Sequence, residues 1–395
     1  MDLYLQMGHG MQQLSIDLLK SWSGGTIIIS PVNIPENRLQ NFSDRISSVG
    51  GKVLFDPQMF YPADGNQKLL EYSYWPTSGI SVTEKQETEN INQELLRINN
   101  RLNTEAIILP GKEFNEDQLD NTLKWLNQSI NYFRNKTSKK LYATVCVYPE
   151  TVRNTNSVES LIDALKNLSV DGFYVIAHPS NDEYIVSDSL WMIGVMKLLV
   201  CLKRLGKVVI AGYSNHQSLI YSLANIDAIA SGTYMNTRSF VPKRFKYKSD
   251  DDIKHKSTWY YLPTAFCEYK ANSLDVAKQR NYLDLFESTE NFSNEYSSVL
   301  FKGAMPSSTN YNESSSFRHY LYCLREQCKI LTKNSYEETS IQYAFMLDVA
   351  ENQINAIKQH GMSGQNRDFA AALEVNRVAM CAIDEDYGLK LKLDW

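Results

Sequence analysis

The chain has 395 residues, of which 43% are hydrophobic, 22% charged and 11% aromatic. These proportions are typical of globular proteins and exclude a wholly disordered or collagen-like chain. Lys and Arg number 40 against 45 Asp and Glu, which gives a formal net charge of −5 at pH 7. That charge excludes a protein that coats nucleic acid by bulk electrostatics, but it is compatible with a local basic patch.

The N-terminus and the most apolar stretch bear on targeting. The first residues, MDLYLQMGHGMQQL, carry no basic region ahead of an apolar run, so we expect no signal peptide. Leu190–Leu202 contains Lys197 and is shorter than the about 20 residues that a bilayer span needs. We therefore expect a cytoplasmic protein that does not contact a membrane.

The six cysteines are scattered, with no CxxC pair, and the closest two are Cys323 and Cys328. A zinc cluster needs two close pairs of ligands, usually with histidines nearby. The pattern favours reduced thiols, and we predict no metal and no cofactor.

Short β-branched runs alternate with amphipathic stretches through the first part of the chain. Most of the runs are apolar nearly throughout, as in strands that are covered on both faces. The eight predicted strands are Leu3–Met7, Thr26–Ser30, Lys52–Asp56, Ala106–Pro110, Leu141–Tyr148, Gly172–His178, Lys207–Tyr213 and Asp227–Gly232.

Helical patterns separate these runs. We predict helices over Met11–Trp22, residues 82–103, Asn115–Phe133, Ser157–Leu168 and Ser189–Leu205. Ser157 is a candidate N-cap, and Gly206 stands where a helix C-terminus favours glycine.

Eightfold alternation predicts parallel strands, because parallel neighbours need a long crossover. Eight such units close into an α/β, (β/α)8 TIM-type barrel; the alternative is a doubly wound open sheet. We assign residues 1–270 to the barrel, with insertions at about 60–81 and 234–269. Residues 271–395 are predicted to form a helical C-terminal extension packed on the barrel, with Phe317–Leu331, Tyr336–His360 and Phe369–Ile383 as its helices. Its apolar stripes could instead receive a protein partner.

Polar residues follow nearly all the predicted strands, and barrel active sites collect at those ends. Asp56 is the candidate acid/base, because it follows an apolar strand directly. Glu150 and Asp182 are candidate second carboxylates, since glycosidic cleavage uses a pair. The candidate substrate-binding residues are His9, Gln58, His178, Asn181, Asn215, Asn236 and Arg238.

The segment after the eighth strand is basic and aromatic. Positive side chains interleaved with Phe240, Phe245 and Tyr247 are typical of a contact with single-stranded nucleic acid. The candidate contacts are Lys243, Arg244, Lys246 and Lys248. The alternative is a solvated loop, since Asp250–Asp252 supply opposite charge.

Histidines at strand ends also allow a divalent metal site. His9, His178 and His216 with Asp56 could supply ligands, which makes a metal-dependent hydrolase an alternative. The strand-end HxH pattern of such barrels is missing, because His9 stands alone between glycines.

Residues 50–240 resemble the tRNA-guanine transglycosylase superfamily, including relatives that insert deazaguanine bases into DNA. VLFDPQMF matches the turn that carries the family's proposed general acid/base, which implies that role for Asp56. DGFYVIAHPSNDE resembles the base-contacting strand, VVIAGYSN the strand after it, and DAIASGTYMNTR the strand that bears the nucleophile. This sequence departs from the family at Ala230, where the nucleophilic aspartate falls, at Pro57 and Gln58, and in lacking the zinc cysteines.

The resemblance and the strand ends together predict a barrel that acts on or binds a nucleobase, nucleoside or nucleic acid. Cleavage of a glycosidic bond would use Asp56 as acid/base, with Glu150 or Asp182 stabilising charge or orienting water. The asparagines would read a base edge, and Arg238 with the basic loop would hold phosphate. The alternatives are an inactive nucleic-acid-binding or scaffold subunit and the metal-dependent hydrolase, so whether the chain is an enzyme stays open.

Overall fold

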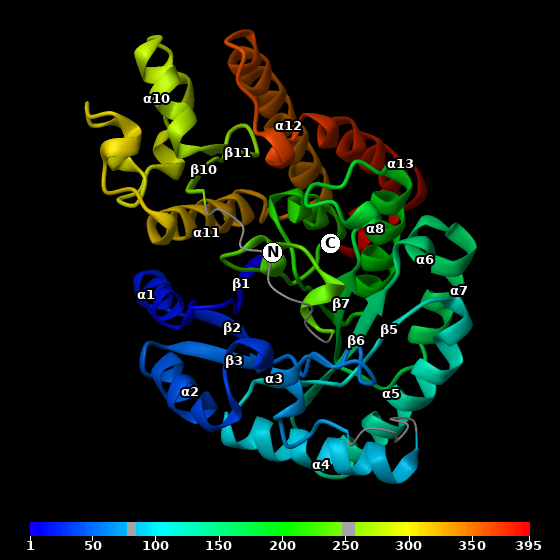
Figure 1. The fold of residues 1–395 in the computed structure, drawn as a ribbon. Coiled ribbons are helices and arrows are strands. Elements are labelled where there is room, and N and C mark those ends of the chain that lie inside the picture. The colour runs from blue at the N-terminus through cyan, green and yellow to red at the C-terminus, as the bar shows by residue number, and fades with distance from the viewer. Residues whose placement is uncertain (77–83, 247–256) are drawn as a thin grey trace.

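Eight parallel strands form a nearly closed barrel in the computed structural model, which describes residues 1–76, 84–246 and 257–395 (Figure 1). The strands are β1 (Asp2–Gln6), β2 (Gly25–Ile29), β3 (Gly51–Phe55), β4 (Ala106–Ile108), β6 (Lys140–Val147), β7 (Gly172–Ala177), β8 (Val208–Ala211) and β9 (Ala228–Ser231). All eight predicted strands are therefore present, within a few residues of the predicted bounds.

The strand order is β3-β2-β1-β9-β8-β7-β6-β4. The barrel strand that comes last in the sequence, β9, pairs in parallel with β1, which comes first. The two ends of this order meet at β3 and β4, where the Glu105 amide donates to the Val53 carbonyl oxygen at 3.1 Å. This cyclic order confirms the barrel and excludes the doubly wound sheet. A two-residue strand, β5 (Glu113–Phe114), pairs with the end of β6.

Helices cover the outside of the barrel, which is why the strands are buried on both faces. The ring contains α1 (Gln12–Trp22), α2 (Leu39–Ser48), α4 (Lys85–Arg101), α5 (Leu119–Arg134), α7 (Thr155–Leu165) and α8 (Ser189–Arg204). The predicted cap Ser157 is not the N-cap of α7: the side chain of Asn154 accepts the Ser157 amide at 3.1 Å. Gly206 follows α8 with φ of 72°, as its position predicted.

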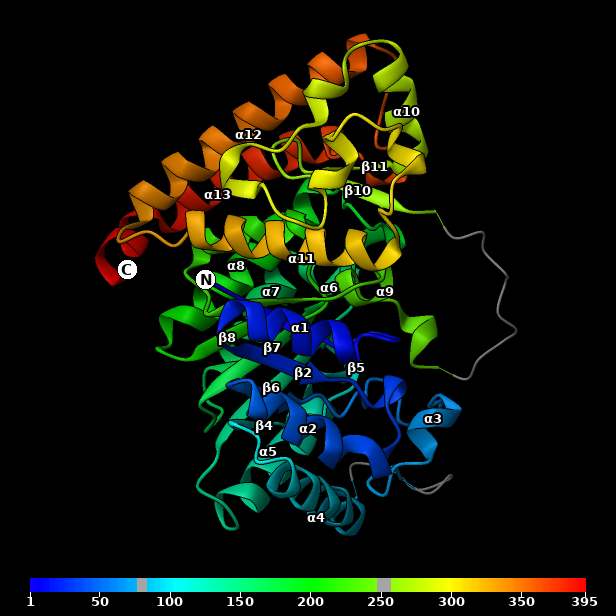
Figure 2. The ribbon, with the colours of Figure 1, turned by 90° about the vertical axis from the view of Figure 1, so that its left-hand side faces the viewer.

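The C-terminal helices complete this ring. After β8 the chain forms the 3-10 helix η5 (His216–Ala224), and after β9 only the short α9 (Met235–Arg238). The tail helices are α11 (Glu313–Ile330), α12 (Tyr336–Gln359) and α13 (Ala370–Asp394). α13 packs on α8 and η5, α12 packs on α13 and η5, and α11 packs on β1 and α1 (Figure 2). The extension therefore packs on the barrel, where the last two helices of a regular barrel would lie.

The remaining elements join these parts. An antiparallel hairpin, β10 (Trp259–Leu262) and β11 (Cys267–Lys270), precedes α10 (Ala271–Gln279). Short helices α3 (Gln67–Leu70) and α6 (Pro149–Arg153) follow β3 and β6. Between α10 and α11 the chain makes a series of short 3-10 helices, η7 (Leu283–Phe286), η8 (Glu290–Phe292), η9 (Ser298–Phe301) and η10 (Pro306–Ser308).

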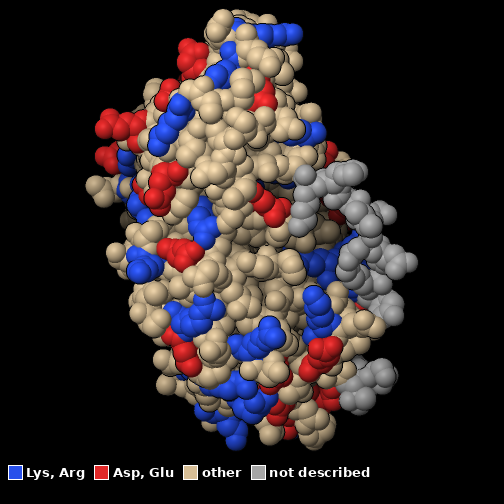
Figure 3. Space-filling model, turned by 60° about the vertical axis from the view of Figure 1, so that its left-hand side comes forward, with Lys and Arg blue, Asp and Glu red and all other residues tan. Residues whose placement is uncertain are grey.

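None of the helices in the described ranges is long and apolar enough to cross a membrane. The six cysteines are free thiols. On the face drawn in Figure 3, Lys and Arg side chains are interspersed with Asp and Glu, as the small net charge implies.

Candidate active site

Asp56 lies at the end of β3 inside the mouth of the barrel, and it has no exposed surface. One carboxylate oxygen, Oδ1, accepts the Gln58 amide at 3.0 Å. The other, Oδ2, accepts the hydroxyls of Tyr213 at 3.0 Å and Tyr174 at 3.3 Å. The side chain of Gln58 donates to the Tyr213 hydroxyl at 2.9 Å, so the structure brings Asp56 and Gln58 into one network.

Burial decides the acidity of this carboxyl group. Loss of solvation raises the pKa of Asp56 to about 6, against the hydrogen bonds from Gln58, Tyr213 and Tyr174 that lower it. The rings of Phe60, Phe240 and Phe245 pack together beside Tyr213, with Phe240 and Phe245 stacked at 5.4 Å. The pKa of Asp56 is therefore closer to neutrality than that of an ordinary aspartate, but its oxygens are occupied and enclosed.

A second cluster at the same end of the barrel reaches the surface. The Nδ1 of His178, just after β7, lies 2.6 Å from Oε1 of Glu113 on β5. Its Nε2 lies 2.9 Å from Oδ1 of Asp182. Glu113 is fully buried and also accepts the Tyr61 hydroxyl, whereas the Asp182 side chain is 72% exposed. The imidazole thus joins a buried carboxylate to an exposed one.

These partners fix the protonation of His178. Burial lowers the pKa of the imidazole, but the hydrogen bonds and charges of Glu113 and Asp182 outweigh it, so the pKa is raised. Glu113 also holds the ring in one orientation, as the carboxylate of a catalytic histidine does. His178 can therefore give a proton from Nε2 once a ligand displaces the exposed Asp182.

Strained backbone marks both clusters. Gln58 and Tyr213 have φ of 53° and 51°, and Asn181 and Asp182 both have φ of 55°. The left-handed region disfavours glutamine and tyrosine, whereas asparagine and aspartate enter it more readily, and such strain gathers at functional sites. The barrel mouth around Asp56 and His178 is therefore the candidate active site.

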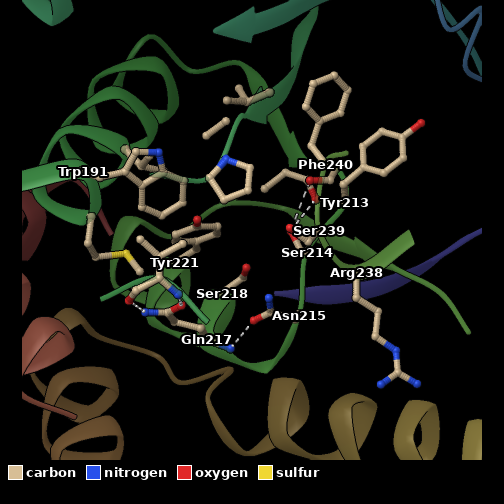
Figure 4. Close-up of a pocket in the computed structure, with 18 of the residues that line it drawn as sticks. Trp191, Tyr213, Ser214, Asn215, Gln217, Ser218, Tyr221, Arg238, Ser239 and Phe240 are labelled. Carbon is tan, nitrogen blue, oxygen red and sulfur yellow. Dashed lines mark hydrogen bonds between the residues drawn. The ribbon is translucent and has the colours of Figure 1, made fainter. Parts of the chain in front are cut away.

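A small cavity of about 40 Å3 lies beside this mouth, between α8 and η5 (Figure 4). Trp191, whose ring nitrogen donates to the His178 carbonyl at 2.8 Å, lines it together with Tyr221 and Ser218. Two predicted residues, Asn215 and Arg238, also line it. The amide group of Asn215 already donates to the Tyr184 carbonyl at 2.7 Å and accepts the Gln217 amide at 2.8 Å.

Arg238 is buried, with a side chain only 2% exposed. Its guanidinium lies 3.1 Å from Glu268 on β11, and Arg367 lies 2.6 Å from the same carboxylate oxygen. The ring of Tyr320 on α11 lies under the guanidinium, 3.4 Å from its carbon. Arg238 thus joins the segment after β9 to the hairpin and the tail, and it shares the Glu268 carboxylate with Arg367.

The other predicted residues that the structure describes take no part in the hydrogen bonds of these two clusters. His9 and Glu150 are exposed, at the ends of β1 and β6. Asn181, next to Asp182, is exposed, and Asn236 is half-buried, with its carbonyl accepting Arg244 at 2.7 Å. Lys243 is exposed, and the ammonium of Lys246 lies 4.3 Å from the ring centre of Tyr61. Lys248 lies outside the described residues.

The four residues considered for a metal do not gather. His216 is buried, and loss of solvation lowers its pKa to about 3, so it is neutral among the rings of Tyr261, Tyr320 and Phe369. Within residues 1–76, 84–246 and 257–395, no group of three or more His, Cys, Asp or Glu side chains is arranged to hold a metal ion.

Sequence reasoning did not select Glu113, Tyr61, Tyr174 or Tyr213 as site residues. Glu113 belongs to a two-residue strand that apolar periodicity cannot detect. The tyrosines belong to apolar runs or to the insertion after β3. Only the hydrogen bonds of their hydroxyl groups in the structure identify them as site residues. A signal was present for Glu113, because it is one of the polar residues just after the predicted strand Ala106–Pro110.

No protein-family model and no curated protein sequence matches this chain. Solved structures with a similar fold include an endo-beta-1,4-mannanase from Thermotoga petrophila, 11% identical, with 64% of this chain and 73% of that chain covered at a TM-score of 0.38. A glucosidase from Croceicoccus marinus is 9% identical over 56% of this chain and 57% of that chain, at a TM-score of 0.35. The carboxyl transferase domain of Rhizobium etli pyruvate carboxylase is 10% identical over 60% of this chain and 41% of that chain, at a TM-score of 0.37.

The chain thus covers less than two thirds of the glucosidase and of the carboxyl transferase domain. The barrel is established by the strand pairing of this chain itself. At these identities the likenesses say nothing of its substrate.

Proposed function

We propose that this barrel cleaves an N-glycosidic bond of a nucleobase-containing substrate, with His178 as the acid. The observation that carries the proposal is the imidazole of His178 between the buried Glu113 and the exposed Asp182 at the barrel mouth. A general acid with a raised pKa is what departure of a nucleobase needs, because the leaving nitrogen must gain a proton.

The proposed cleavage needs only His178, Asp182 and a water molecule. A bound substrate displaces Asp182 from Nε2, and the imidazolium gives its proton to the base as the sugar–nitrogen bond breaks. The bonding electrons leave with the base, and the oxocarbenium ion takes the oxygen of a water molecule. Asp182 accepts the proton of that water and releases it to solvent, and solvent restores the proton on His178. Two groups on opposite sides of the bond perform this chemistry in glycoside cleavage.

The choice of a nucleobase is supported by the likeness of residues 50–240 to the transglycosylase superfamily and by the surroundings of His178. The ring of Tyr148 lies 6.2 Å from the imidazole, where a base could stack. Lys246 contacts the ring of Tyr61, whose hydroxyl binds Glu113, so this ammonium group lies near the acid and could hold a phosphate.

Asp56 has a different part in this proposal from the one that the resemblance implies. Its enclosed carboxyl group orients Tyr213 and Tyr174, so we assign it as a positioning residue. We likewise assign Arg238, which pairs with the buried Glu268, a structural role in place of substrate binding.

The experiment measures free base released from nucleosides and from single-stranded RNA and DNA oligonucleotides, by chromatography. We expect release by the wild-type chain and a loss of about 100-fold or more in His178→Gln, within the range of general acid catalysis. Asp163→Asn, at an exposed position near the C-terminal end of α7, is the matched control. Release that survives His178→Gln overturns the assignment.

One observation favours a second function, an inactive barrel that binds nucleic acid or a protein. At the place of the family's nucleophile, Ala230 presents a buried methyl group on β9, and phenylalanine rings fill the mouth. Oligonucleotide binding without base release would support this function. Absence of both oligonucleotide binding and base release would overturn the glycosidic cleavage and the nucleic-acid-binding function.

A further inference from the structure

Helix α12 has two apolar faces, and only one of them is buried. The first face, with Tyr343, Leu347 and Ala350, packs into the core. The second face consists of Gln342, Phe345, Met346 and Val349, at the spacing that places residues on one side of a helix. Phe345 is 61% exposed, so this second face lacks an apolar partner over part of its surface.

This second face forms one wall of a groove of about 510 Å3 that is separate from the barrel mouth. Its other walls are the β10–β11 turn, the segment of η8 (Glu290–Phe292) and the end of α11, which Figure 2 shows beneath α12. Phe266 and Phe292 are buried, whereas Ile330 is half-buried. The volume and the mostly apolar lining are those of small-molecule sites.

The groove carries a single charge. Lys333, in the turn between α11 and α12, is the one ionisable residue among those that line it. The other polar lining residues are neutral: Thr264, Thr289, Asn291 and Gln342. An apolar surface with one cation complements an apolar molecule with one negative charge.

We propose that this groove binds a free apolar monoanion, such as a carboxylic or sulfonic acid with a hydrocarbon or aromatic body. The body would lie along Phe345, Met346 and Val349, and the acid group would face Lys333. An anionic bilayer is disfavoured, because Glu337, Glu338 and Asp348 are exposed on the same helix. This inference does not depend on the function proposed for the barrel mouth.

The test titrates the full chain with 1-anilinonaphthalene-8-sulfonate and follows its fluorescence, with decanoate below its micellar concentration as competitor. We expect one saturable site that decanoate empties. Lys333→Glu should weaken the sulfonate about tenfold, which corresponds to about 1.4 kcal/mol. The same variant should leave the uncharged probe N-phenyl-1-naphthylamine unchanged, whereas Val349→Glu should weaken both probes.

Lys329→Glu is the matched control, since Lys329 is also near the end of α11 but pairs with Glu326 and does not line the groove. Thermal unfolding checks that each variant folds, and Phe345→Ala replaces Val349→Glu if that variant does not. Equal sulfonate binding by wild type, Lys333→Glu and the groove variant overturns the proposal. Binding of the chain to phosphatidylglycerol vesicles without binding of the free sulfonate also overturns it. A third contrary result is a dimer that the groove variant dissociates, together with a sulfonate signal that decanoate does not displace.

Discussion

Glu113 and His178 form the closest acid–imidazole contact at the barrel mouth described here, with Oε1 of Glu113 2.6 Å from Nδ1 of His178. The two residues are separated in the sequence by α5, β6, α6 and α7, yet β5 and β7 flank β6 and bring their ends together. A fully buried carboxylate beside an imidazole stabilises the imidazolium, because little solvent screens the pair.

Replacing Glu113 should change the titration of His178. In Glu113→Gln we expect the imidazole pKa to fall, because the charge that opposes the effect of burial is gone. The imidazole resonances of His178 and of the exposed His9 in NMR spectra across pH give the result and an internal control. Unchanged His178 titration, or an equal shift at His9, would contradict the geometry.

The same pair predicts a pH dependence of stability. The pKa of His178 is raised on folding, so its contribution is complete below its unfolded pKa of about 6.5 and is lost as pH rises through the folded pKa. Denaturant unfolding at several pH values should show this loss in the wild-type chain and a smaller loss in Glu113→Gln. An identical pH profile for the two proteins would refute the coupling.

Asp56 should also make stability fall as pH rises, but here burial, and not a charged partner, raises the pKa. Its pKa rises to about 6 on folding, so the folded state holds an extra proton between about pH 4 and 6. The free energy of unfolding should therefore fall by about 3 kcal/mol as pH rises through this window. Asp56→Asn cannot ionise and should lack the fall, whereas the exposed Asp64→Asn should keep it. Urea unfolding from pH 4 to 8 makes the measurement.

The buried Glu268 should be a strong determinant of stability. Burial raises the pKa of this carboxyl group, but Arg367 and Arg238 outweigh burial and lower it to about 2. Glu268→Gln leaves the buried guanidinium of Arg238 and the half-buried one of Arg367 without their anion, for a loss of about 3–5 kcal/mol at neutral pH. Exposed Glu287→Gln is the control. In the wild-type chain the stabilisation is present above about pH 4.3 and fades as pH falls toward 2.

The close packing of α8 against α6 gives a last prediction. A Cβ built on Gly194 of α8 would lie 1.7 Å from the Val152 carbonyl oxygen of α6. Because backbone must move to admit it, Gly194→Ala should cost about 3 kcal/mol or more. Leu190→Ala, on an exposed position of the same helix, should cost far less. Differential scanning calorimetry compares the two, and equal melting temperatures would show that α6 and α8 lie further apart.

The sequence by itself determined the architecture, because a strand that is covered on both faces must be apolar along its length. The run from Leu141 to Tyr148 therefore predicts β6 without any neighbour, and the repeated alternation predicts parallel pairing and a barrel. The same argument placed Asp56 and His178 at strand ends, since a strand end follows directly from where the apolar run stops.

Only the tertiary structure decided what those side chains touch. Asp56 and Arg238 are polar residues after strands in the sequence, and the fold encloses one among tyrosines and pairs the other with Glu268. Glu113 has no periodic signal, but it lies against His178 because β5 pairs with β6. The physical reason is that periodicity records which face of an element is buried, whereas acidity and accessibility depend on partners that are distant in the chain.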